Sequence, residues 1–185
     1  MPLKLYRINT MIEHSDNMAG FYKKADDIYN YFKLNKGNEE EIRRRKLDFI
    51  AGEGYNLNNI NKTDFVICPI ALLFSKRFVD KVGDILKADM HFVPCNLVFE
   101  STNFEWYACK IKKKLSVIDK DNSIYRTLTD GKKTIKFARY RKDIEEPFFI
   151  AEDSDYSTYI VASDLFKELC EKNDIHIKFE KPEIF

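Results

Sequence analysis

One predicted strand carries two residues that could support thiol or metal chemistry, His91 and Cys95. Alternate residues of a strand point to the same side, so their spacing allows both side chains to share one face. A zinc site needs three or four converging ligands, and Cys68, Cys109 and Cys170 form no C-x-x-C motif with a neighbour. A cysteine nucleophile needs a positioned base, and no cysteine here has a local signature of one. The favoured interpretation is a buried thiol beside a strand histidine, and the sequence predicts no metal and no cofactor.

Serine and carboxylate chemistry also finds little support. Ser75 and Ser163 lie in no glycine pattern of a nucleophile elbow, and each is predicted to cap a helix. Acid–base catalysis needs carboxylates in unequal environments within a cleft, whereas the paired acids of this chain lie in predicted turns and are interpreted as solvated. Those pairs are Asp119 and Asp121, Glu145 and Glu146, and Asp153 and Asp155. The segment 52–54 is too short for a phosphate-binding loop. The sequence therefore predicts no catalytic residue.

Two basic runs, Arg43–Arg45 and Lys112–Lys114, could contact phosphates. Neither is interleaved with aromatic residues that would stack on bases, and acids precede the first run. The chain has 31 Lys and Arg against 30 Asp and Glu, a formal net charge of +1. A dedicated nucleic-acid binder would usually carry a clear basic excess. We interpret both runs as solvated faces and predict no nucleic-acid partner.

Aromatic and acidic residues at two places could instead anchor a partner protein. In the strand that contains Phe104 to Tyr107, Trp106 and Tyr107 point to opposite faces, and only one face can be core. The polar loop 152–157 is expected to be exposed. Interface hot spots are enriched in Trp, Tyr and charged residues. The predicted partner-binding residues are Trp106, Tyr107, Asp153, Asp155 and Tyr156.

An internal repeat organises the elements that position these residues. Residues 70–80 and 159–168 each read as a short apolar strand, a serine and an amphipathic helix. A second strand follows each helix, at 90–93 and at 175–179. Neighbouring strand-like runs with few long helices predict an α+β fold with a mainly antiparallel sheet, built on two strand–helix–strand half-repeats.

The first third differs in pattern and is expected to form an N-terminal helical extension. Apolar residues recur at helical spacing from Met18 to Phe32, Asn38 could cap a further helix, and Leu3–Ile8 could be a first strand. The stretch 52–62 is rich in Gly and Asn and reads as a loop. We therefore predict a variable region at 1–62 and an α+β domain at 63–185.

Composition constrains the cellular setting. The four cysteines fall in predicted strands or on an apolar helix face and are interpreted as reduced, buried thiols, which is typical of a reducing compartment. The N-terminal residues lack the apolar core of a signal peptide, and no apolar run reaches membrane-spanning length. The sequence therefore predicts a cytoplasmic protein with no membrane contact.

Three groups of residues in the C-terminal two-thirds resemble a bacterial family. Leu72–Phe78 with Met90–Pro94 is similar to its opening, and Trp106–Ile111 with Val117–Ser123 is similar to its central element. Phe148–Ile150 before Tyr159–Phe166 is similar to its close. This order resembles the immunity proteins of polymorphic toxin systems, immunity family eleven, over about residues 64–179. One departure is 173–176, Asn-Asp-Ile-His, where the family commonly has a Gly before its last strand.

The resemblance implies a cytosolic protein that binds a cognate secreted toxin C-terminal domain, occludes its active site and catalyses nothing. It assigns no contact residue, and the first third shows no match. Two alternatives stay open. One is an enzyme that reverses a modification made by a toxin, for which two or more of Cys95, Cys109, His91, His176 and the acidic residues would converge in a pocket. The other is an interaction module unrelated to toxins. The toxin and the oligomeric state are not specified by the sequence.

Overall fold

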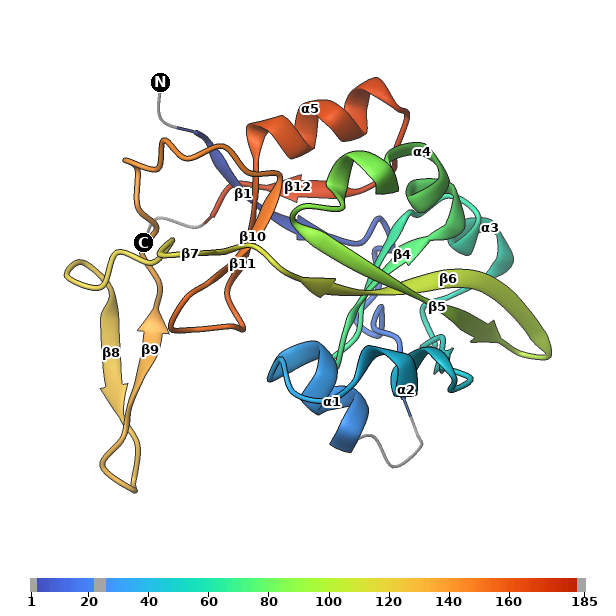
Figure 1. The fold of residues 1–185 in the computed structure, drawn as a ribbon, viewed down its shortest axis with the longest axis horizontal. Coiled ribbons are helices and arrows are strands. Elements are labelled where there is room, and N and C mark those ends of the chain that lie inside the picture. Colours follow the sequence, from blue (N-terminus) through green and yellow to red (C-terminus); the bar gives the residue numbers. More distant parts are fainter. Residues whose placement is uncertain (1–2, 22–25, 183–185) are drawn as a thin grey trace.

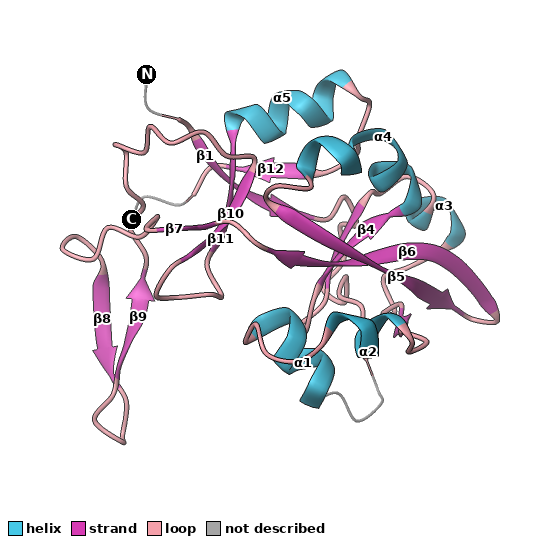
Figure 2. Cartoon of the chain, in the orientation of Figure 1, coloured by secondary structure: helices cyan, strands magenta, loops and turns pink. Residues whose placement is uncertain are grey.

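The computed structural model describes residues 3–21 and 26–182. Two five-stranded mixed sheets and a separate two-stranded sheet are combined with five helices in the described ranges (Figures 1 and 2). Most strand pairs are antiparallel. The predicted α+β class with a mainly antiparallel arrangement is confirmed.

The first sheet has the strand order β2-β5-β6-β4-β3. Its strands are β2 (Asp48–Ile50), β3 (Phe65–Ile67), β4 (Leu72–Ser75), β5 (Met90–Phe99) and β6 (Thr102–Ile111). The long hairpin β5–β6 turns at Glu100, whose φ is 53°. Pro94 has no backbone N–H to donate. It precedes Asn96, the first residue of β5 that pairs with β2, so no hydrogen bond of that ladder is lost at Pro94.

The second sheet has the order β12-β1-β11-β10-β7. Its strands are β1 (Leu5–Asn9), β7 (Lys114–Leu115), β10 (Ile150–Asp153), β11 (Ile160–Ser163) and β12 (Lys178–Glu180). Strand β1 lies between β11 and β12 and pairs antiparallel with both. The first residues of the chain therefore complete a sheet formed mainly by its last third.

The predicted half-repeats are present, and both have the same topology. In the first, α4 (Lys76–Leu86) connects β4 to β5, and the antiparallel strand β6 lies between these two strands. In the second, α5 (Asp164–Lys172) connects β11 to β12, with β1 between them. Each half-repeat is thus a split β-α-β unit, whose two outer strands are parallel and separated by an inserted third strand. The sequence pattern showed the outer strands but not the insertions.

Equivalent residues of the two repeats meet in the core. Ser75 and Ser163 cap α4 and α5, accepting hydrogen bonds from the backbone N–H groups of Phe78 (3.1 Å) and Phe166 (3.4 Å). Both phenylalanines are fully buried, and their ring centroids lie 6.1 Å apart. Phe78 also stacks on Phe74 at 4.4 Å. The same cluster contains apolar residues of both sheets, so it joins the repeats.

The N-terminal helices contribute to the core on the face of the first sheet opposite α4. They are α1 (Asp26–Lys33), α2 (Glu39–Arg43) and α3 (Leu57–Ile60). Figure 1 shows α1 and α2 on that side. Asn38 caps α2 as predicted. A helix was predicted from Met18 to Phe32, and its start was wrong. Met18 and Gly20 instead form isolated β-bridges with Ile67 and Ile50. Tyr22 and Ala25, which belong to the same prediction, lie outside the described residues. The predicted loop 52–62 contains α3, which Asn56 caps.

Residues 1–62 supply strands to both large sheets, β1 to one and β2 to the other. The division into regions 1–62 and 63–185 stays a prediction, but the sheets include strands from both parts. A third core cluster joins the outer part of the second sheet to the segment 117–148. Among the described residues, no helix is long and apolar enough to span a membrane.

Candidate functional site

The structure separates the predicted partner-binding residues into two regions. Trp106 and Tyr107 lie on β6 in the middle of the first sheet, paired with Ser75 and Phe74 of β4. Trp106 is only 3% exposed and belongs to the core that packs against the N-terminal helices. The prediction that Trp106 is a partner-binding residue is therefore wrong, because helices cover the face that it shares with Phe104. Tyr107 points to the other face and is half-buried.

Asp153, predicted to be exposed, is 1% exposed at the end of β10. One carboxylate oxygen accepts hydrogen bonds from the backbone N–H groups of Val117 and Ile118, each at 2.9 Å. The other accepts those of Asp155 and Tyr156, each at 3.0 Å. Asp153 thus holds two loops together, and its role is structural.

Asp155 and Tyr156 lie at the base of a projecting hairpin. The hairpin consists of β8 (Ile124–Thr127) and β9 (Lys133–Phe137), which pair only with each other among the described strands (Figure 1). Asp155 forms an ion pair of 2.6 Å with Lys120, and a hydrogen bond with Tyr156 raises the pKa of the Tyr125 phenol. These two predicted residues therefore lie beside the hairpin, in a region that the sequence reasoning did not single out.

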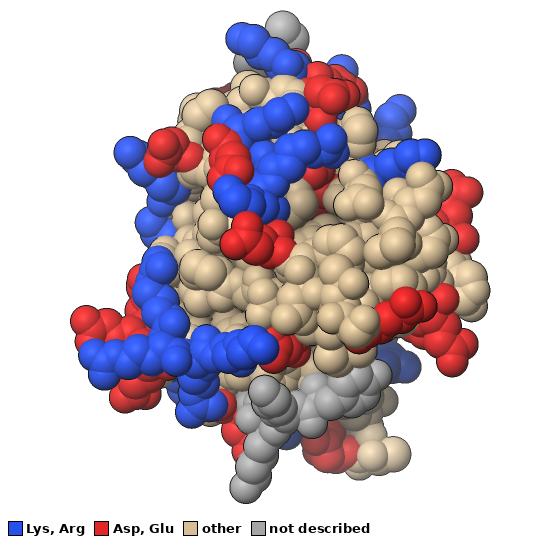
Figure 3. All heavy atoms as spheres, turned by 90° about the vertical axis from the view of Figure 1, so that its right-hand side faces the viewer, with Lys and Arg blue, Asp and Glu red and all other residues tan. Residues whose placement is uncertain are grey.

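This hairpin is strongly basic. Residues 124–142, called the basic hairpin below, contain seven Lys and Arg side chains and one acid, Asp130, although the whole chain has a net charge of only +1. Most of the hairpin is exposed. The basic hairpin therefore concentrates positive charge at one end of the protein. The opposite end, shown in Figure 3, instead has an uncharged centre surrounded by groups of both signs.

The two faces of the basic hairpin differ. Tyr125 and Ile135 are paired across the strands and pack against the third core cluster. The pair Ile124 and Phe137 is exposed, at 49% and 42%, and a register irregularity separates it from the Tyr125 pair. The Lys136 ammonium lies 5.3 Å from the centroid of the Phe137 ring. Exposed apolar groups mixed with cations are typical of a protein-binding surface.

A groove of about 290 Å³ lies between β9 and the second sheet. We call it the hairpin groove; it is lined by Arg7, Lys136, Phe137, Ala138, Tyr140, Thr158, Tyr159 and Ile160. Arg7 comes from β1 and Lys136 from β9, so two distant segments each provide a cation. Within the described ranges, no carboxylate lies within ion-pair distance of either cation.

Tyr140 forms the wall shared by the hairpin groove and two larger depressions. Burial raises the pKa of its phenol, and the positive charge of Arg7 opposes this shift only in part. The phenol therefore stays protonated at neutral pH and can donate a hydrogen bond into the groove. An aromatic wall with a phenol donor and two cations can accommodate a carboxylate.

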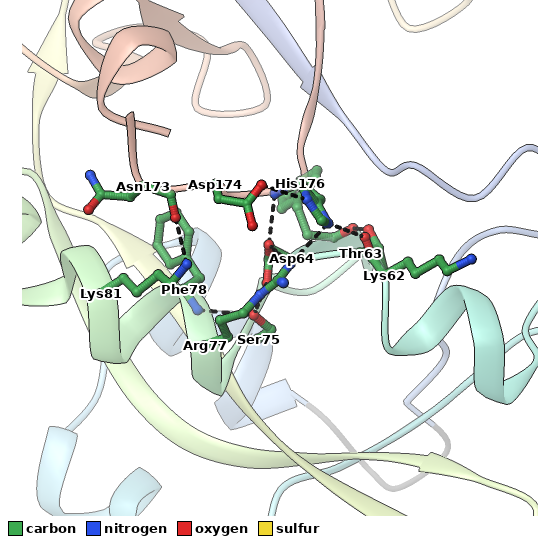
Figure 4. Close-up of polar contacts among 11 residues, drawn as sticks. Lys62, Thr63, Asp64, Ser75, Arg77, Phe78, Lys81, Asn173, Asp174 and His176 are labelled. Atoms are coloured by element: carbon green, nitrogen blue, oxygen red, sulfur yellow. Dashed lines mark hydrogen bonds and ion pairs between the residues drawn. The ribbon is translucent and has the colours of Figure 1, made fainter. Parts of the chain in front are cut away.

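A second polar cluster lies where the two half-repeats meet, and we call it the junction (Figure 4). The Asp64 carboxylate, 1% exposed, accepts hydrogen bonds from the Ser75 hydroxyl, from Arg77 Nε at 3.0 Å and from the His176 backbone N–H at 2.7 Å. Its second oxygen also accepts from the Arg77 terminal nitrogen. These donors come from β4, α4 and the segment after α5, so Asp64 connects both repeats.

Burial of the Asp64 carboxyl acts to raise its pKa, but the hydrogen bonds from Arg77, His176 and Ser75 and the charge of Arg77 outweigh burial and lower it. The carboxylate is therefore ionised at neutral pH. The Ser75 hydroxyl donates to Asp64 and accepts from Phe78, which is the pattern of a helix cap. The Asp64 carboxylate that it contacts has a lowered pKa and is therefore a weak base. A pocket of about 370 Å³ beside the junction is lined by Asp64 and Glu105, yet both oxygens of Asp64 are already occupied.

The thiols and histidines do not converge. Cys68, Cys95, Cys109 and Cys170 are buried and free, as predicted, and burial raises the pKa of each thiol. The imidazole of His91 lies 3.0 Å from Glu39 on α2, whereas His176 lies at the junction. In the part of the chain that the structure describes, no group of three or more His, Cys, Asp and Glu could hold a metal ion.

The basic hairpin was visible in the sequence but overlooked. Its cations are interspersed with Ile124, Leu128, Ile135 and Phe137, whereas the sequence interpretation considered only contiguous runs such as Lys112–Lys114. Charge counted over a window of about twenty residues would have identified it. The contribution of Arg7 to the groove has no comparable signal, because it depends on β1 lying next to β11.

No protein-family model matches the chain, and no curated protein matches it.

Proposed function

We propose that this protein is an immunity protein that binds a cognate bacterial toxin domain in the cytoplasm and neutralises it by occluding the toxin's active site. The observation that carries the proposal is the basic hairpin, an exposed surface of cations and apolar side chains held on a well-packed body. Such a surface suits binding to a partner protein.

The resemblance to immunity family eleven supports the same proposal. Its sequence elements coincide with β4–α4–β5, β6 and β10–β11–α5 in this fold. The family commonly has a Gly before its last strand, where this chain has residues 173–176. Asp174 at this place has a φ of 52°, a backbone conformation that glycine adopts most readily. The two split β-α-β units then form the scaffold, and the hairpin between them contacts the toxin.

The chemistry of the polar clusters favours binding over catalysis. Asp64 and Asp153, the acids with the most hydrogen-bond donors around them, are saturated by those donors. A stable inhibitor complex buries about 800 Å² on each partner, and a projecting hairpin with flanking loops can supply such an area.

Co-expression with the C-terminal domain encoded by the neighbouring gene tests the proposal. We expect growth to be rescued, a 1:1 complex to co-purify, and toxin activity in vitro to fall in proportion to the molar amount of this protein. Rescue at far less than equimolar amounts, with no stable complex, would instead indicate an enzyme that reverses the toxin's modification.

A charge-reversed variant localises the contact. Replacing Arg126, Lys133 and Lys136 with Glu should weaken the complex at least tenfold, which corresponds to about 1.4 kcal/mol. The matched control replaces Lys36, Lys62 and Lys172 with Glu; these lysines are also exposed and belong to other segments of the chain. Equal binding by the two variants would show that the hairpin is not the contact surface.

A further inference from the structure

We propose that the hairpin groove is an anchor site for an acidic segment of the partner protein, with one carboxylate held between Arg7 and Lys136. This inference rests on the proposed function, because it identifies the chemistry of the same contact surface. It adds a specific binding site, the residues that form it and the class of ligand that it takes.

Charge is the first argument. Arg7 and Lys136 reach the groove from two different sheets, and both are exposed. In the described residues neither has a carboxylate at ion-pair distance, although many cations of this protein do, including Lys120 with Asp155 and Lys114 with Glu152. Glu180 is the cross-strand neighbour of Arg7, but neither cation forms an ion pair within the described residues. Both can therefore pair with an external carboxylate.

The shape and walls of the groove provide the second argument. Tyr140, Tyr159 and Phe137 line it, and its volume of about 290 Å³ is at the lower end of the range for small-molecule pockets. It can therefore take one or two side chains rather than a large substrate. The aromatic rings also offer apolar contact to the methylene groups of an acidic side chain held between the two cations.

The surroundings favour a carboxylate over a nucleic acid. Binding to a nucleic acid uses a continuous track of cations along the phosphate backbone. Here the adjoining depression of about 870 Å³ contains Asp119, Asp121 and Asp143 beside its cations. Arg141 is already paired with Asp143 through two hydrogen bonds of 2.9 and 2.8 Å. An isolated carboxylate avoids these acids, whereas a chain of phosphates would pass them.

The outer strand edges of the basic hairpin can bind the rest of the partner's acidic segment. β8 and β9 pair only with each other among the described strands, so the outer edge of each retains unpaired backbone groups. Lysines on such an edge oppose pairing with a second copy of the same hairpin, because like charges would face each other. The same lysines attract an acidic segment.

Solution NMR with defined probes tests the groove without knowledge of the toxin. The full chain is titrated with poly-L-glutamate and, separately, with single-stranded oligothymidylate, while backbone amide shifts are followed. We expect saturable shifts with poly-L-glutamate at Arg7, Lys136, Tyr140 and Tyr159. The double variant R7Q/K136Q should bind this probe at least tenfold more weakly, whereas the control K36Q/K172Q should bind it unchanged.

Three results would overturn the inference: no shifts at the groove, equal binding by R7Q/K136Q, or tighter binding of oligothymidylate there. Co-purification with the toxin domain separates this inference from the proposed function. A toxin complex that R7Q/K136Q leaves unchanged would refute the anchor site while the immunity function stands. Absence of any toxin complex, with poly-L-glutamate still bound in the groove, would refute the immunity function alone.

Discussion

The junction and the basic hairpin are both rich in charged groups but differ in where those charges find their partners. At the junction, the Asp64 carboxylate receives donors from Ser75, Arg77 and the His176 backbone, all within the chain. In the hairpin groove, Arg7 and Lys136 have no such carboxylate among the described residues. Charges satisfied internally stabilise the fold, whereas charges left facing solvent can contribute to binding a partner.

The comparison also shows why residue type alone is a poor guide to function. A serine, a histidine, an arginine and an aspartate meet at the junction, a set that resembles a catalytic site by composition (Figure 4). Its hydrogen-bond directions describe a helix cap and an ion pair instead. The groove is less conspicuous in composition, yet it is the more accessible of the two.

The largest effect on stability is expected where the two half-repeats touch. Replacing Phe78 with Ala should lower the free energy of unfolding by about 3–5 kcal/mol, because a fully buried ring is lost and a cavity remains. Urea denaturation measures this change. Phe166→Ala should cost a similar amount, and the double variant less than the sum, since the rings contact each other. Additive losses would contradict a shared core.

The second-largest loss in the free energy of unfolding is expected for Asp64→Ala. It removes a buried acceptor from Arg77, Ser75 and the His176 backbone, and we expect a loss of about 2–3 kcal/mol in the free energy of unfolding. Because Arg77 is partly exposed and can be solvated, the loss should stay below that of Phe78→Ala. A change below about 0.5 kcal/mol would show that the junction contributes little to stability.

The pH dependence of stability provides a smaller effect from the same residue. The folded pKa of Asp64 lies below its unfolded value of about 3.9. Its contribution is therefore fully present above pH 4 and is lost as the pH falls through the folded pKa. The difference in unfolding free energy between the natural protein and Asp64→Asn should be constant near neutrality and should shrink below about pH 4. A difference that grows on acidification would contradict the lowered pKa.

The basic hairpin should give the smallest effect on stability. Charge reversal at Arg126, Lys133 and Lys136 should change the free energy of unfolding by less than about 0.5 kcal/mol, since these side chains are exposed. Thermal unfolding compared with the Lys36, Lys62 and Lys172 control measures this. A large destabilisation would mean that the hairpin cations stabilise the fold, and the contrast with the junction would disappear.

Local patterns in the sequence predicted much of the fold. Both serine caps, both amphipathic helices and the strands on either side of them follow from short-range periodicity. The inward-facing residues of α4 followed the helical pattern only in part. Ile85 of α4 has helical spacing to Val82 and Phe78 and yet is 50% exposed, because the buried side of that helix is formed by Phe78, Val82, Gly83 and Leu86.

Long-range pairing was not predictable in the same way. Nothing local in Leu5–Asn9 indicates that β1 lies between β11 and β12, and the Met18–Gly20 bridges override a helical pattern. The errors at Trp106 and Asp153 have the same origin. Trp106 was covered by helices from another part of the chain, and Asp153 was buried by the backbone of Val117 and Ile118.

Hydrogen–deuterium exchange on the complex with the co-encoded toxin domain tests directly whether this protein acts by covering the toxin with its basic hairpin. We predict slower exchange on binding in β8, β9 and residues 155–160, and little change in α4 and α5. Protection confined to α4 and α5, or unchanged exchange at the basic hairpin in a verified complex, would contradict the claim that the hairpin covers the toxin.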